Sequence, residues 1–239
     1  MGKLFAVIAL ILICYLNGYA QAPLSNDKLR AEKILAQARQ AKGGLEKLKK
    51  VEDLVYSGDF ISYMPSGTTR QKLKMYLAQG RKVRTDVDTN ASGFDGSTGW
   101  FNDNPLDERM LYESERRAAR EWFLNLLVVP KDMKLTAIAR PDEKVGGKPV
   151  EVIAVTIGIA MFNLYFDKQS HLILKVSYGV MNGKEEITIE EVQEDYQDVK
   201  GIKFAHRQLG YENGKLSGEI VINEYQPNTG IDPQKFARK

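Results

Sequence analysis

The chain has 239 residues, of which 34 are lysine or arginine and 31 are aspartate or glutamate, giving a formal charge of +3. This balance, and the lack of a basic stripe interleaved with aromatic residues, excludes nucleic acid as an expected partner. The length suits one domain with a sizeable core, because no stretch in the middle has the composition of a linker. A single cysteine excludes a disulfide framework within the chain.

The first twenty residues are typical of a secretory signal peptide. Lys3 precedes an apolar run that ends at Leu16, and this run is shorter than the roughly 18 to 20 residues of a membrane-spanning helix. Small residues up to Ala20 fit a cleavage site. We therefore expect residues 1–20 to be a signal peptide and residues 21–239 to form a single exported domain.

The one cysteine lies inside this predicted signal peptide. Lipid-attachment cysteines follow a small residue, but Ile13 precedes Cys14, so we expect no lipid anchor at Cys14. Cleavage after Ala20 would leave a domain without any thiol for catalysis.

Helical periodicity comes first in the predicted domain. Ser25 and Asn26 can cap a helix that ends at the Gly43–Gly44 pair, and a second short helical turn follows in LEKLKKV. The apolar residues of the first helix recur near helical spacing, at Leu29, Ala31, Ile34, Leu35, Ala38 and Ala41.

From Val51 onward the apolar residues recur with a period of two. The clearest example places Leu73, Met75 and Leu77 on one side of a strand, whereas the residues between them are Lys74 and Tyr76. One dry face and one wet face are typical of antiparallel sheets.

Residues 86–100, DVDTNASGFDGSTGW, have the oxygen-rich composition of a metal site. A calcium loop of the EF-hand type would use Asp86, Asp88 and Asn90, but it needs Gly where Ala91 stands and Glu where Ser97 stands. The stretch also lacks the Gly-Lys-Ser/Thr ending of a phosphate loop. It therefore predicts a chain reversal that leads into an aromatic return strand around Trp100.

A heavily charged helix is expected to begin near Asp107 and to stop before Pro130, with an apolar end in WFLNLLVV. Seven further strand segments follow, separated by turn signals such as Asn213–Gly214. The whole pattern predicts an α+β, mostly antiparallel β fold with about ten strands and helices inserted between hairpins.

No catalytic constellation is present in the sequence. The two histidines, His171 in a turn and His206 in a strand, lack a second metal ligand at helical spacing and are expected at the surface. The acid pairs Glu185–Glu186 and Glu190–Glu191 fit the solvated face of a strand. We therefore expect a protein that is not an enzyme, with no catalytic residue, no metal and no cofactor.

The chain resembles the LolA/LolB superfamily of bacterial envelope proteins, including its outer membrane lipoprotein-sorting members. The similarity lies in the order of its segments rather than in one motif. These segments are the signal peptide, ILAQARQAKGGLEKLKKVEDLVYSGDF, FDGSTGW, the helix ending in WFLNLLVVP, FDKQSHLILKV, YQDVKGIKFAHR and YENGKLSGEIVINEYQPNTGIDPQKF.

The resemblance implies a strongly curved, incomplete antiparallel barrel whose open mouth is covered by helices. It also implies a periplasmic protein that binds or carries acyl chains of lipids or lipoproteins in a hydrophobic cavity, touching membranes only transiently. The alternative is a protein-interaction module, either an envelope sensor or an accessory subunit of a peptidase. The expected ligand-lining residues are Leu73, Met75, Leu77, Trp122, Phe123, Leu126, Phe162, Leu164 and Leu174.

Overall fold

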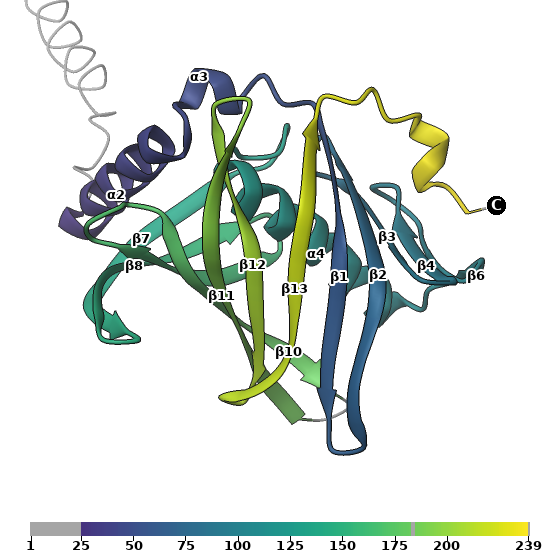
Figure 1. The fold of residues 1–239 in the computed structure, drawn as a ribbon. Helices are drawn as coiled ribbons and strands as arrows, with labels where there is room; N and C mark the ends of the chain where they lie inside the picture. The colour runs from purple at the N-terminus through teal and green to yellow at the C-terminus, as the bar shows by residue number, and fades with distance from the viewer. Residues whose placement is uncertain (1–24, 183–184, 239) are drawn as a thin grey trace, which may run out of the picture.

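The computed structural model describes residues 25–182 and 185–238, so the predicted signal peptide lies outside the described residues. Within these ranges, thirteen antiparallel strands form one sheet in the order β6-β5-β4-β3-β2-β1-β13-β12-β11-β10-β9-β8-β7. The sheet is strongly curved, and because β6 and β7 are its two edges it remains unclosed (Figure 1). No helix in the described part of the chain is long and apolar enough to cross a membrane.

The strands of the first half are β1 (Asp53–Met64), β2 (Gly67–Ala78), β3 (Lys82–Val87), β4 (Asn90–Phe94), β5 (Gly99–Phe101) and β6 (Asn104–Pro105). Those of the second half are β7 (Leu135–Val145), β8 (Lys148–Ile157), β9 (Ala160–Asp167), β10 (Ile173–Asn182), β11 (Glu185–Val199), β12 (Ile202–Glu212) and β13 (Lys215–Pro227). The helices are α2 (Asn26–Lys42), α3 (Leu45–Leu48), α4 (Glu108–Leu126) and the 3₁₀ helix η1 (Pro233–Phe236).

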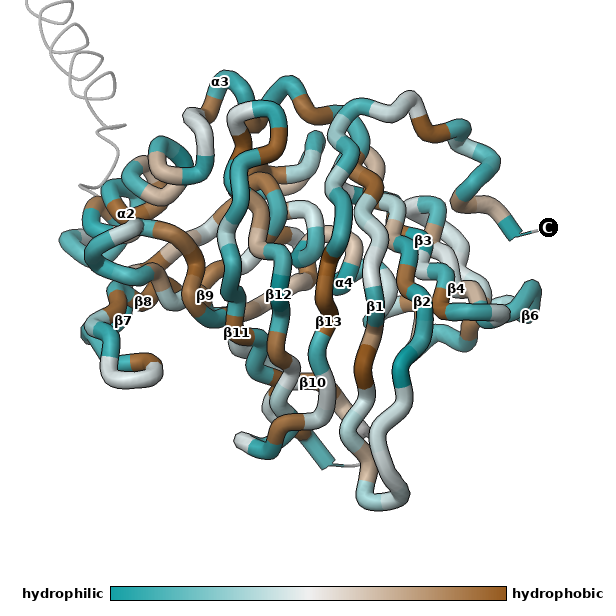
Figure 2. Tube along the Cα trace, in the orientation of Figure 1, coloured by the Kyte–Doolittle hydropathy of each residue, from teal (hydrophilic) through white to brown (hydrophobic). Residues whose placement is uncertain are grey.

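The mostly antiparallel fold was predicted correctly, but the prediction of about ten strands was too low. The short strands β4, β5 and β6 span five, three and two residues, too few to show a period. The longer strand β2 does show it, since Leu73, Met75 and Leu77 are buried whereas Lys74 and Tyr76 between them are not. Figure 2 shows hydrophobic stretches interrupted by hydrophilic ones along the central strands.

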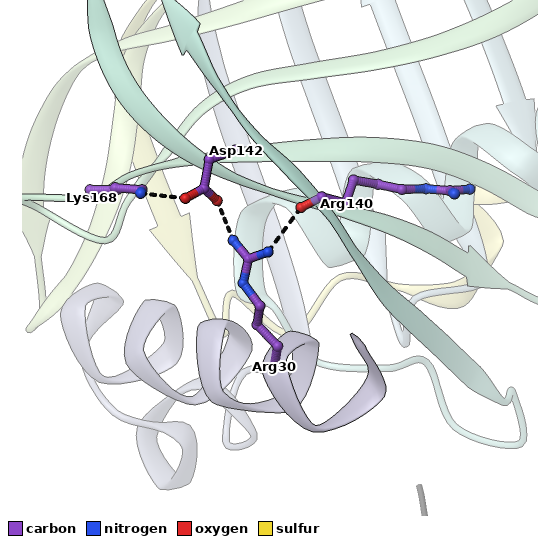
Figure 3. Close-up of polar contacts among 4 residues, drawn as sticks. All are labelled: Arg30, Arg140, Asp142 and Lys168. Carbon is purple, nitrogen blue, oxygen red and sulfur yellow. Dashed lines mark hydrogen bonds and ion pairs between the residues drawn. The ribbon is translucent and has the colours of Figure 1, made fainter. Parts of the chain in front are cut away.

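Helix α2 packs against the edge of the sheet that β7 forms. Its buried residues Ala31, Ile34, Leu35 and Ala38 confirm the predicted apolar face, whereas Leu29 is 51% exposed. Arg30 donates to the carbonyl of Arg140 at 3.1 Å and pairs with Asp142, which also pairs with Lys168 (Figure 3). The pairs join α2 to β7 and β7 to the turn after β9.

Helix α4 crosses the concave side of the sheet. Asp107 caps it by accepting a hydrogen bond from the Met110 amide at 2.8 Å. The helix was predicted to continue almost to Pro130, but it ends at Leu126 because Leu127 adopts the left-handed conformation. There Arg39 of α2 donates to the Leu127 carbonyl at 2.9 Å and fixes the end of the helix.

Two sides of α4 build two separate parts of the core. Ala119 and Phe123 pack with α2 and with strands β7 to β10. Ala118, Trp122 and Leu126 instead pack with strands β1 to β4, β12 and β13. Two sides of α4 are therefore buried in the core, and its third face belongs to neither part of the core.

Residues 86–100 run from the end of β3 through β4 into β5, and residues 95–98 form the turn between β4 and β5. The carboxylate of Asp95 accepts four hydrogen bonds, from the amides and hydroxyls of Ser97 and Thr98, at 2.8 to 3.0 Å. The turn returns Trp100 across Gly93, where an added Cβ would lie only 2.5 Å from the indole ring. Trp100 is 3% exposed and donates to the Phe236 carbonyl at 2.8 Å.

We expect Asp95→Ala to lower the free energy of unfolding by about 1 kcal/mol, because the change removes a side chain that organises the turn much as a helix cap does. Urea unfolding of the two proteins measures this difference. Glu32→Ala, on the exposed side of α2, serves as the control and is expected to stay within about 0.5 kcal/mol. Equal stability of Asp95→Ala and the parent would show that the backbone holds this turn alone.

Candidate functional site

A cavity of about 740 Å³ lies between α4 and the concave face of the central strands β1, β13, β12, β11 and β10. This volume falls within the range of about 300 to 1,000 Å³ that small-molecule sites occupy. Met64, at the β1–β2 turn, lines the cavity and is still 48% exposed, which places an opening at the hairpin ends. The apolar part of its wall consists of Phe60, Met75, Val180, Ile189 and Ile220.

Three small residues on the neighbouring strands β1, β13 and β12 line the sheet side of the cavity, which we call its floor. Ser62 of β1 pairs with Gly218 of β13, and Gly218 in turn pairs with Gly210 of β12. All three line the cavity. Because paired residues of adjacent strands share a face, this row leaves the sheet without side-chain bulk across the floor.

The inner wall is charged and comes from the third face of α4. Glu113, Arg117, Arg120 and Glu121 all line the cavity, at the helical spacing that places them on one side. The Arg120 guanidinium carbon lies 3.6 Å from the ring centre of Tyr178 in β10, whose hydroxyl donates to Glu191 of β11 at 2.6 Å. This wall thus combines two acidic and two basic side chains of α4 with Tyr178 and Glu191 of the sheet.

Burial changes the acid–base properties of these groups. Burial and the neighbouring Glu191 carboxylate raise the pKa of Glu121 above its ordinary value. Burial and Glu191 likewise raise the pKa of the Tyr178 hydroxyl, so that it stays protonated and donates. The Tyr56 hydroxyl, also with a raised pKa, donates to the Met75 sulfur at 2.7 Å.

A second, water-sized space of about 10 Å³ lies next to the main cavity. Glu121, Glu191 and Gln208 line both spaces. Lys42, the last residue of α2, faces the smaller space and is only 3% exposed. Its ammonium lies 5.3 Å and 5.6 Å from the ring centres of Phe204 and Tyr196, and burial lowers its pKa to about 7.

The nine residues predicted from the sequence to line a ligand site lie in several places. Met75 lines the main cavity, whereas Leu73 and Leu174 line two separate depressions of about 400 and 330 Å³. The other six are at most 4% exposed and pack in the core: Leu77, Trp122, Phe123, Leu126, Phe162 and Leu164. A ligand-lining role for these nine residues stays a prediction.

The structure corrects the expectation that both histidines lie at the surface. His206 is 9% exposed, its Nδ1 lies 2.8 Å from the Ile222 carbonyl, and its ring meets Tyr225 edge-on. Glu191, expected on a solvated face, instead points into the cavity, whereas Glu190 pairs with Lys175. Among the described residues, no group of His, Cys, Asp and Glu side chains is placed to hold a metal ion.

Sequence reasoning missed the charged wall of the cavity. The signal for it was present, because Glu113, Arg117, Arg120 and Glu121 recur at i, i+4, i+7 and i+8. They lie beside the alanines and aromatic residues that α4 buries in the core. A charged stripe on a helix usually faces water. Only the position of α4 inside the curved sheet turns this stripe toward a cavity.

The architecture defines a class of protein, in which an unclosed antiparallel sheet curves around one crossing helix and keeps a cavity between them. Solved structures share it. A LolA superfamily protein from Nitrosomonas europaea superimposes with a TM-score of 0.59 and 9% sequence identity, over 87% of this chain and 97% of that chain. The chain therefore has a LolA-like fold.

Two further structures agree with this fold. One is a domain from Vibrio parahaemolyticus whose name provisionally assigns it to outer membrane lipoprotein sorting, with a TM-score of 0.57 and 15% identity over 86% of this chain and 97% of that chain. The other is a DUF1329 family protein from Desulfovibrio piger, with a TM-score of 0.57 and 9% identity over 87% and 97%. No protein-family model and no curated protein matches the sequence.

Proposed function

We propose that the chain binds and carries acyl chains of lipids or lipoproteins in the periplasm, without catalysing a reaction. The observation that supports this most is the cavity of about 740 Å³ with its apolar wall and its opening beside Met64. Burying an acyl chain there stabilises the complex by ~0.8 kcal/mol for each CH₂ group. In this proposal α4 covers the cavity and acts as the lid that the resemblance implies.

The first test asks whether the protein as purified holds a lipid. Solvent extraction followed by mass spectrometry is expected to release acyl-chain species, and a fluorescent fatty acid is expected to bind and be displaced by hexadecanoate. Failure of both measurements would refute carriage. A single stoichiometric protein partner in a pull-down, together with no lipid, would favour the interaction module instead.

A sharper test fills the cavity from its floor. Gly210 lies opposite Glu191, which lines the cavity, so a side chain added there points into the same space. An added Cβ would meet only ordinary contacts, at 3.6 Å from the Gly218 carbonyl and 3.7 Å from the Ser217 hydroxyl. The backbone therefore accepts a larger residue at this position.

We expect Gly210→Phe to weaken hexadecanoate binding about tenfold and to affect the shorter decanoate much less, since excluding two CH₂ groups costs roughly 1.6 kcal/mol. Displacement of the fluorescent fatty acid measures both affinities. Glu224→Phe, at an exposed position of β13, is the matched control and should bind like the parent. Unchanged hexadecanoate affinity in Gly210→Phe would mean that the chain does not occupy this cavity.

A further inference from the structure

Arg120 is the feature of the cavity that the burial of acyl chains leaves unexplained. It is 6% exposed, yet its Nε–H has no hydrogen-bond partner among the described residues. Its Nη2 lies 4.0 Å from Glu121 Oε1, which is beyond hydrogen-bond distance. A buried donor without a partner is costly, and such groups in native proteins call for an explanation.

The surroundings of Arg120 hold its guanidinium in a fixed orientation. One face lies 3.6 Å from the centre of the Tyr178 ring, so stacking occupies that face. The N–H groups of a guanidinium lie in its plane and remain at the edge, in a geometry that matches the two oxygens of a carboxylate or a phosphate. The side chain is thus arranged to bind an oxyanion that enters through the cavity.

The nearby carboxylates act on Arg120 through their charge, but among the described residues none of them accepts a hydrogen bond from it. Glu191 accepts a hydrogen bond from the Tyr178 hydroxyl at 2.6 Å, and Glu113 accepts two from Arg116 at 2.9 and 3.2 Å. The raised pKa of Glu121 makes this acid less readily charged than an ordinary glutamate. Arg117 adds a second positive charge to the same wall.

We propose that Arg120 binds the acidic head group, a carboxylate or a phosphate, of an amphipathic ligand whose acyl chain lies along the apolar wall toward Met64. This inference rests on the proposed function and adds to it the chemical class of the ligand and its orientation. The head group lies under α4, and the chain points toward the hairpin ends.

Ligands with the same twelve-carbon chain and different head groups test the inference on the unmodified protein. Laurate and dodecyl phosphate are expected to bind at least about tenfold tighter than dodecanol and dodecylammonium, which is the size of one charge-assisted hydrogen bond. If dodecanol binds equally well, carriage stands and the head-group inference fails. If none of the four binds, both fail.

Inorganic phosphate and acetate test whether the head group alone is the ligand. Both are expected to bind far more weakly than dodecyl phosphate and laurate, because they lack the chain. Binding of inorganic phosphate as tight as that of dodecyl phosphate would overturn the amphipathic ligand and would indicate a site for a free anion.

Variants then assign the effect to Arg120. Arg120→Met should weaken laurate binding at least tenfold and change dodecanol binding less than twofold, whereas Arg109→Met, on an exposed part of the same helix, should change neither. Where Arg120→Met fails to fold, Glu121→Gln provides the readout, because removing the negative charge that Glu121 still carries beside Arg120 should tighten laurate binding about twofold. An equal loss of laurate and dodecanol in Arg120→Met, or weaker laurate binding in Glu121→Gln, would refute the inference.

Discussion

Replacement of Lys42 by methionine is expected to stabilise the protein by about 3 kcal/mol at pH 7. Burial lowers the pKa of Lys42 from 10.5 to about 7, and no carboxylate among the described residues pairs with its ammonium. The shift corresponds to a folding cost on the order of 4 kcal/mol at pH 7, offset in the variant by about 1 kcal/mol of lost contacts with two aromatic rings. Methionine keeps an unbranched stem of similar length without the charge.

The same group predicts a dependence of stability on pH. Between pH 7 and 10.5 the unfolded chain holds a proton on Lys42 that the folded chain releases, so the free energy of unfolding rises with pH in this window. From pH 7 to 9 we expect a rise of about 2 kcal/mol in the parent that is absent from Lys42→Met. Staying below pH 10 avoids the opposite trend of the buried tyrosines, whose raised pKa values favour unfolding at alkaline pH.

Urea unfolding of both proteins at pH 7, 8 and 9 measures the effect. Lys33→Met, at an exposed position of the same helix, is the control and should differ from the parent by less than about 0.5 kcal/mol at each pH. A parent whose pH slope equals that of Lys42→Met would show that the ammonium is hydrated or paired in solution. A loss of stability in Lys42→Met would lead to the same conclusion.

The sequence predicted the faces of the sheet better than it predicted the space between the sheet and α4. Leu73, Met75 and Leu77 do lie on the dry side of β2, as their alternation with lysine and tyrosine indicates. Their surroundings differ nevertheless, since Leu77 is covered by core side chains and Met75, two residues away, borders the cavity. Where a crossing helix stops covering a sheet depends on tertiary packing, and no local pattern encodes it.

The same limit applies to the order of the strands. The pairing of β1 with β13 joins segments more than 150 residues apart, for example Ser57 with Glu224, and brings Phe60 beside Ile220. Hairpin signals such as Asn213–Gly214 predict only neighbouring pairs. The cavity depends on the long-range pair, because its wall contains residues of both β1 and β13.

Phe123→Ala is expected to lower the free energy of unfolding by about 3 to 5 kcal/mol, the range for removing a fully buried phenylalanine. Phe123 is 0% exposed, and its ring centre lies 6.1 Å from that of Phe162, on the side of α4 that faces α2 and β7 to β10. Because this side is separate from the cavity wall, the folded variant should bind hexadecanoate within about twofold of the parent affinity.

Phe60→Ala provides the matched comparison, since Phe60 is only partly buried and lines the cavity. It should cost about 1 kcal/mol of stability but weaken hexadecanoate binding on the order of tenfold, through lost contact with the acyl chain. Urea unfolding measures the stability of both variants, and displacement of the fluorescent fatty acid measures their affinity for hexadecanoate. Together the two measurements distinguish a residue of the core from a residue of the binding site. The reverse result, with lost binding in Phe123→Ala and normal binding in Phe60→Ala, would place the acyl chain beside Phe123 and Phe162. The ligand would then lie among the residues that the sequence alone predicts to line it.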